Sequence, residues 1–318
     1  MRARAAVKRL SHVIAVLSIV TFMTMLMLDL APGDPARVAA GDTATPEQLA
    51  AAREQLNLDK PVIVRWLLWV GDLLRGDLGT SLRTRQDVSD VLIERIPVTA
   101  EIAVLALVMA LVIAIPVGTW SAYRKGRAFD KVSQAVGSVL ISAPSFLVAL
   151  VLSYGLALQL GWLPIVGWAG FAEDPVGNLR TATLAVLSLA LCEAAVFVRL
   201  LRSDMITVLG QEYVLAATAK GLSPYRVLVK HALRPSSFSL LTLAGISLGR
   251  LIGGTVTIEV IFSIPGIGQL IYQSIMNKDV ITVQGAVAFI AIAYIIINAT
   301  VDLMYTWLDP RIKVGGKR

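Results

Sequence analysis

The sequence predicts an all-α integral membrane protein with six transmembrane helices. Hydrophobic residues make up 56% of the 318 positions and charged residues only 16%, whereas soluble domains carry about 25% charged residues. Six apolar runs reach the roughly 18 residues needed to cross a hydrocarbon core about 30 Å thick. This composition excludes an ordinary soluble enzyme and a disordered chain. The predicted spans lie at 12–31, 99–122, 133–160, 181–200, 238–262 and 283–307.

The first apolar run has an alternative interpretation as a cleaved signal peptide. Basic residues precede it, and Val38-Ala39-Ala40 faintly resembles a cleavage site. The run is longer than the roughly 7–15 apolar residues of a signal peptide, so we favour a retained membrane anchor.

Lys and Arg residues predict the orientation of the spans. The N-terminus, the loop near 123–132, the loop 199–237 and the C-terminal tail together hold 18 of them, while the two short opposite loops hold only Arg180 and Lys278. Cytoplasmic loops carry the excess of basic residues, so both termini are expected in the cytoplasm. The net charge of +7 is attributed to this bias and not to nucleic-acid binding.

The segment 32–98 is predicted to form an external helical cap between spans one and two. Thr45 and Gln48 form a capping-box pattern around Pro46, and a second apolar pattern with two tryptophans follows Pro61. The alternative is a solvated loop. The predicted organisation is therefore residues 1–31 as N-terminus and first span, 32–98 as cap, 99–307 as membrane core with a cytoplasmic loop at 201–237, and 308–318 as tail.

The cytoplasmic loop carries the most informative pattern. An alanine-rich stretch after Gln211 has high helix propensity, and Gly221 is placed to end that helix in a left-handed conformation. Ser223 and Pro224 then form the N-cap and first residue of another helix. A short helix across the cytoplasmic face suits force transfer from a soluble partner. On these residues alone, an ordinary linker between spans is an equal alternative.

The chain shows no catalytic pattern. It contains no G-x-x-x-x-G-K-[ST] sequence for ATP binding. One cysteine, Cys192, and two histidines, His12 and His231, argue against a disulfide framework and a metal site. Pro265, Gly266 and Gly268 are expected to form a tight external turn, in which the glycines free the backbone and the proline ends span five.

The cytoplasmic loop resembles the EAA loop of ABC importer permeases, in the version of the dipeptide and oligopeptide branch. The matching residues are Tyr213-Val214, Ala217, 219–222 and 231–234. Other stretches resemble the same branch in the same order: 30–35, 58–61, 76–81, 259–268 and 308–311. The resemblance covers nearly the whole chain. It implies the type I importer transmembrane fold and the first of two permease subunits.

The resemblance further implies a permease of the bacterial inner membrane that imports peptides. Its partners would be a second permease, two cytoplasmic ATP-binding subunits and an external substrate-binding protein, with ATP and Mg²⁺ bound only by the partner subunits. Nickel or glutathione import is the alternative within the class. A secondary transporter or channel and a membrane enzyme are the alternatives outside it. The residues implied in coupling to the ATPase are Glu212, Tyr213, Ala216, Ala217, Ala219, Lys220, Gly221 and Leu222.

Two features depart from the family pattern. Pro235-Ser236 follows the His-Ala-Leu-Arg stretch and is expected to break the helix entering span five. Glu193 and Arg250 are charged residues inside predicted spans, where each needs a partner or a function. A buried ion pair between them is favoured. A substrate role for Arg250 is the first alternative, and misplaced span boundaries or a partner on the second permease are the others. Glu259 is the poorer partner, because nine helical residues place it on the opposite face from Arg250.

Overall fold

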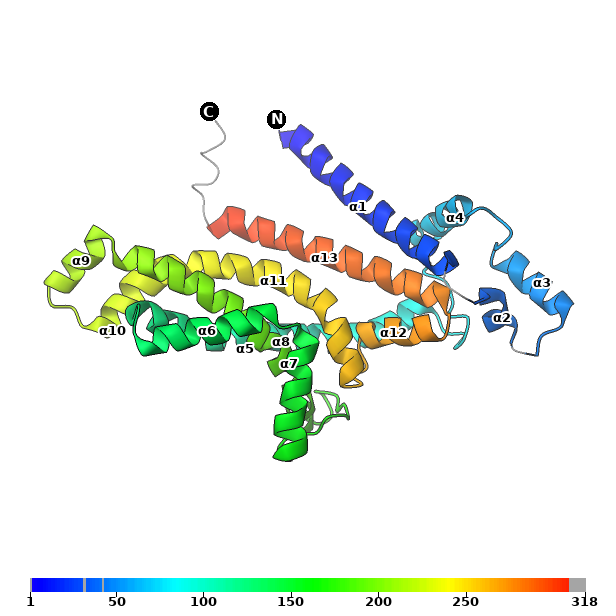
Figure 1. Ribbon diagram of the computed structural model, residues 1–318. Coiled ribbons are helices and arrows are strands. Elements are labelled where there is room, and N and C mark those ends of the chain that lie inside the picture. Colours follow the sequence, from blue (N-terminus) through cyan, green and yellow to red (C-terminus); the bar gives the residue numbers. More distant parts are fainter. Residues whose placement is uncertain (1, 31–32, 42, 309–318) are drawn as a thin grey trace. The chain divides into compact units, whose positions relative to one another are not determined.

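The computed structural model describes residues 2–30, 33–41 and 43–308 (Figure 1). In these ranges every regular element is a helix, apart from one isolated antiparallel bridge between Thr80 and Asp87. Five helices are long and apolar enough to cross a membrane, and one bent helix pair makes a sixth span if its two parts cross together. The predicted all-α membrane fold is confirmed, with five or six candidate spans. The last residue of the predicted first span and the predicted tail beyond Leu308 lie outside the described residues.

The described chain divides into two compact units. One contains the residues up to Thr99 together with Pro265–Ile296, and the other contains Ala100–Ile264 together with the residues from Ile297 on. This division differs from the predicted one, because the segment that follows span five packs with the N-terminal third. Val88 and Leu92 share a buried cluster with Ile267 and Ala286.

The first unit combines long apolar helices with short amphipathic ones. Thr45 accepts from the Gln48 N–H while Gln48 accepts from the Thr45 N–H, so the predicted capping box is confirmed. Trp66 donates from its indole nitrogen to the Thr21 hydroxyl (3.1 Å) and thereby ties two helices together. The elements of this unit are α1 (Arg2–Leu30), α2 (Pro35–Ala40), α3 (Pro46–Gln55), α4 (Val62–Leu74), the start of α5 (Val88–Tyr123), α12 (Ile267–Met276) and the first part of α13 (Val280–Leu308).

A buried carboxylate joins a loop to the start of α13. Asp279 accepts hydrogen bonds from the Ser81 hydroxyl (2.5 Å), the Leu82 N–H (3.2 Å) and the Thr282 hydroxyl (2.9 Å). It also caps α13 by accepting from the Thr282 N–H (3.3 Å). Sequence reasoning missed Asp279, although an Asp directly before an apolar helix is an N-cap signal.

The second unit is organised around α8 (Pro175–Leu209), which packs against α6, α7 and α11. Its core mixes alanines with a few large side chains, among them the fully buried Phe197 and Leu201. Small residues let these helices approach closely, and a Cβ on Gly118 would lie 3.1 Å from a methyl of Leu201. The other elements of this unit are the rest of α5, α6 (Ala128–Ser142), α7 (Ser145–Leu152), α9 (Glu212–Ala219), α10 (Pro224–Arg226), α11 (Arg234–Ile261) and the end of α13.

The predicted third span is not one straight helix. α6 ends at Ser142, and the chain resumes as α7 and a π-helical segment at an angle of 111° (Figure 1). Pro144 accounts for the bend, since the residue before a proline is driven out of the helical region. Ala143 is accordingly extended, with φ −85° and ψ 131°.

The turn after α11 forms differently from the prediction. α11 ends at Ile261, four residues before Pro265, and the left-handed residue is Ser263 (φ 52°). Ile264 donates to the Glu259 carbonyl (2.9 Å) and Ser263 to the Val260 carbonyl (3.3 Å), which together make a Schellman motif. Gly266 is extended and Gly268 is buried inside α12, so the expectations that Pro265 ends the span and that these glycines supply the freedom of the turn were wrong.

Candidate functional site

The short helix predicted in the cytoplasmic loop is α9. It lies at the end of the second unit where α8 stops and the chain returns through α10 (Figure 1). Gly221 has φ +77° and donates to the Thr218 carbonyl (2.9 Å), so the predicted left-handed end of the helix is confirmed. Ser223 occupies the next N-cap position and Pro224 the first turn, although the Ser223 side chain makes no cap hydrogen bond.

α9 has a buried face and an exposed face. Val214 and Ala217 are only 2% and 8% exposed. Ala217, implied above as a partner contact, is therefore covered by this chain itself. The remaining implied residues leave an exposed surface of small, aromatic and charged side chains: Glu212, Tyr213, Ala216, Ala219, Lys220 and Gly221, with Leu222 partly exposed.

The helix that follows is continuous despite Pro235. One candidate span runs from Pro224 to Ile261, so the predicted break at Pro235 was wrong. The chain accommodates the proline through a π-helical segment, Val227–Leu233, directly before it. Within that segment the His231 carbonyl accepts a hydrogen bond from the Tyr213 hydroxyl of α9 (3.3 Å).

Asp130 and Arg202 form an ion pair that was not predicted from the sequence. Asp130, at the start of α6, is 3% exposed, and Arg202 of α8 donates to both of its carboxylate oxygens (2.5 and 2.8 Å). Ser121 of α5 and the Gly126 N–H also donate to Asp130. This bidentate clamp joins α5, α6 and α8, the last of which leads directly into α9. The only sequence signal was an acidic residue in a first helical turn.

Glu193 and Arg250 form an ion pair between α8 and α11. One guanidinium nitrogen of Arg250 lies 2.7 and 3.0 Å from the two carboxylate oxygens and 3.1 Å from the Ser247 hydroxyl. The Glu193 side chain is 12% exposed, whereas that of Arg250 is 56% exposed. Glu259, further along α11, is fully buried. Whether Arg250 also faces a substrate pathway stays a prediction.

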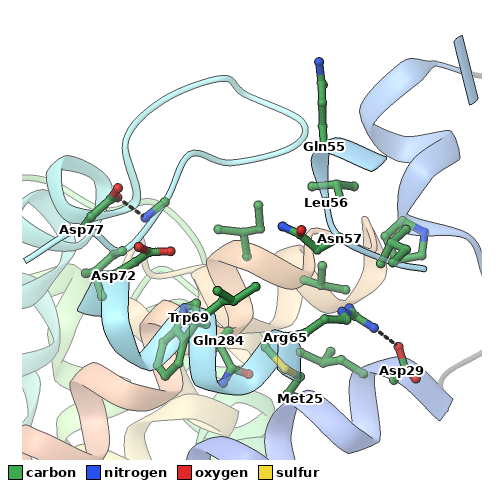
Figure 2. A pocket seen from close by; sticks show the side chains of 18 residues that line it. Met25, Asp29, Gln55, Leu56, Asn57, Arg65, Trp69, Asp72, Asp77 and Gln284 are labelled. Atoms are coloured by element: carbon green, nitrogen blue, oxygen red, sulfur yellow. Dashed lines mark hydrogen bonds and ion pairs between the residues drawn. The ribbon is translucent and has the colours of Figure 1, made fainter. Parts of the chain in front are cut away.

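The first unit contains a partly open pocket of about 220 Å³ between α1, α4, the loops around them and α13 (Figure 2). Apolar side chains dominate its walls, while Arg65 points toward Asp29 at one end and Asp72 and Asp77 lie at the other. Gln284 donates to the Thr21 carbonyl (2.8 Å), which links α13 to α1 at the pocket wall. These contacts brace the helices against one another.

Comparison with known proteins decides the family. The model of the binding-protein-dependent transport system inner membrane component matches residues 114–314, and that of the N-terminal region of such components matches residues 2–103. The chain belongs to this family. It is therefore the permease of a binding-protein-dependent ABC importer and a multi-pass inner membrane protein. In this family the permease is the membrane component, and ATP hydrolysis resides in a separate subunit.

Relatives of the permease align over nearly the full length. The probable peptide ABC transporter permease protein of Sinorhizobium fredii is 36% identical over 96% of this chain and 98% of its own. The dipeptide transport system permease protein DppB of Alkalihalophilus pseudofirmus is 33% identical over 97% and 98%. The glutathione transport system permease protein GsiC of Salmonella choleraesuis is 33% identical over 96% and 97%.

A solved structure matches the fold of the permease. A chain of the MetNI methionine ABC transporter, in inward facing conformations, superposes with a TM-score of 0.56. The match covers 69% of the permease and 96% of that chain at 18% identity, so it shows the fold alone. It confirms the expected type I importer fold.

Proposed function

We propose that this permease forms half of the membrane pathway of a peptide importer. Its partners are a second permease, two cytoplasmic ATP-binding subunits and an external substrate-binding protein. The observation that carries the substrate class is full-length similarity to relatives named for peptide, dipeptide and glutathione transport, all of which are peptides in the chemical sense. Purifying the assembled complex and identifying the molecule held by its binding protein tests the proposal. Recovery of a metal or a sugar in place of a peptide would overturn it.

The proposed orientation places both termini and α9 in the cytoplasm. The excess of Lys and Arg on one set of loops supports it. Single cysteines at positions 127 and 223, in a Cys192→Ser background, should react with an impermeant thiol reagent only after permeabilisation. Cysteines at positions 85 and 175 should react from outside in intact cells. The reverse pattern would remove α9 from the side where ATP is hydrolysed.

In this proposal α9 docks against an ATP-binding subunit and transmits its closure. The exposed surface of α9 supports this role, because Ala216 and Ala219 let another backbone approach closely while Tyr213 and Leu215 offer apolar area. Ala216→Arg places a long charged side chain on that surface without entering the core of the permease. We expect uptake to fall at least tenfold, together with loss of substrate-stimulated ATP hydrolysis.

Two further variants, Ala217→Arg and Ala172→Arg, are compared with Ala216→Arg. Ala217→Arg is the poorer test, since Ala217 is buried and its replacement also disrupts folding. Ala172→Arg is the matched control, because Ala172 is exposed and lies in the opposite loop before α8. All three are compared by membrane content and by recovery of the ATP-binding subunit with the purified permease. Normal uptake by Ala216→Arg would refute docking through this face.

A further inference from the structure

Pro235 changes the hydrogen bonding of the helix that returns from α9 to the membrane. In an α-helix the carbonyl of each residue accepts from the N–H four residues later, and Pro235 has no N–H to offer His231 in that register. His231 lies instead in a π-helical segment, where a carbonyl accepts from the N–H five residues later. The proline ring also pushes the His231 carbonyl away from the helix axis. The π-helical segment Val227–Leu233 ends just before this point and shows where the helix adapts.

Tyr213 supplies a donor to the same carbonyl. Its hydroxyl lies 3.3 Å from the His231 oxygen, and the two residues stand 18 positions apart on different helices. The contact therefore joins α9 to the helix of span five by a route other than the turn at Gly221. That turn has an exposed glycine in its centre and is a poor element for transmitting force.

We infer that Tyr213 is a positioning residue, which couples α9 to span five by donating to the His231 carbonyl, in the π-helical segment where Pro235 prevents the regular α-helical register. Movement of α9 then reaches α11 through this hydrogen bond, supported by the packing of Val214 and Ala217. The inference gives Pro235 a role: the departure from the family pattern removes one competing backbone donor from the carbonyl that Tyr213 binds. It rests on the proposed coupling function of α9.

The contact itself is tested by amide hydrogen exchange on the assembled complex without nucleotide. Loss of one hydrogen bond between neutral groups corresponds to about a fivefold change in a local opening equilibrium. We expect Tyr213→Phe to speed exchange in α9 by about that factor. Pro235→Ala, which restores a backbone donor to His231, should act in the same direction. Because both changes affect one hydrogen bond, the double variant should exchange no faster than the faster single variant.

Tyr225→Phe is the matched control. Tyr225 lies in the same loop with 76% of its surface exposed, so removal of its hydroxyl should leave α9 unchanged. Unchanged exchange in Tyr213→Phe would overturn the contact. So would exchange that is about 25-fold faster in the double variant, because the two substitutions would then act independently.

Transport separates positioning from mere stabilisation. If Tyr213 positions α9, Tyr213→Phe lowers the substrate moved per ATP hydrolysed, by about two- to fivefold, while the complex remains assembled. An unchanged ratio would overturn the positioning role even where exchange is faster. If instead Ala216→Arg leaves uptake normal while exchange responds as described, the proposed docking function fails and the Tyr213 contact stands as a structural one.

Discussion

The Glu193–Arg250 ion pair allows a quantitative test of how the burial of each partner determines the cost of removing the other. The two side chains differ in exposure, at 12% for Glu193 and 56% for Arg250. Breaking a buried pair by removing one partner costs about 3–5 kcal/mol, because the remaining charge is stranded, whereas exposed pairs contribute about 0–1 kcal/mol. The two single substitutions should therefore have unequal effects.

The direction of the asymmetry follows from the residue that each substitution leaves behind. Arg250→Gln leaves a nearly buried carboxylate without its cation, and we expect a loss of about 2–3 kcal/mol in the free energy of unfolding. Glu193→Gln leaves a guanidinium that this chain covers only in part. With its uncovered side in an aqueous pathway we expect a loss of about 1 kcal/mol or less, whereas lipid on that side would make the loss as large as for Arg250→Gln. The double substitution should recover about 1–2 kcal/mol relative to the sum of the single losses.

Chemical denaturation of the purified complex in detergent measures these differences. Arg199→Gln is the matched control, since Arg199 is an exposed residue of α8 that donates to the Ser138 hydroxyl. Strict additivity in the double variant would refute the reasoning, and equal losses for the two single variants would refute an aqueous pathway beside Arg250. Unchanged stability in Arg250→Gln, with weaker transport of peptides that have a free carboxylate than of amidated peptides, would assign Arg250 to the substrate pathway.

Three further predictions concern other parts of the permease. Arg202→Gln strands the buried Asp130 and should lower the free energy of unfolding by about 3 kcal/mol, whereas Arg202→Lys should lower it by less. If Arg202→Gln unfolds at the same temperature as the unaltered protein, the clamp is contradicted. Ser263→Gly removes the cost of a left-handed non-glycine residue and should stabilise by about 0.5–1 kcal/mol, while Ser263→Ala should show no gain in the same assay. Arg53 holds the pKa of Asp34 below its ordinary value mainly by a hydrogen bond. The stability lost in Arg53→Gln should therefore be constant above about pH 4 and vanish as the pH falls further. A stability difference between the two proteins that grows on acidification would contradict this.

Features that depend on near neighbours in the chain could be predicted from the sequence. The capping box of Thr45 and Gln48 and the left-handed Gly221 each involve a few consecutive residues, and both form as expected. The spans follow from the length of apolar runs, because a membrane selects helices by length and composition. The bend at Pro144 was also within reach, since a proline in an apolar run limits the residue before it.

Local patterns failed where a helix could respond in more than one way. Pro235 was expected to break the helix, but a π-helical turn and a hydroxyl from another helix accommodate it. The turn after α11 was expected at the glycines, but Ser263 takes the left-handed position because the carbonyls of Glu259 and Val260 receive their hydrogen bonds there. Both outcomes depend on which donors and acceptors remain free, and composition does not show this.

The sequence by itself determined that this protein spans the membrane, which loops carry the basic charge and where α9 begins and ends. Only the tertiary structure decided which charges meet. Asp130 and Arg202 are 72 residues apart and Ser81 and Asp279 are 198 apart, yet each pair is in hydrogen-bond contact. The tertiary structure also decided which face of α9 is exposed. Packing against the rest of the chain buries Ala217 and leaves Ala216 exposed, and the sequence of the helix alone does not show this. Partners distant in sequence are chosen by helix packing, since the local pattern around a carboxylate does not show which cation on another helix will lie beside it.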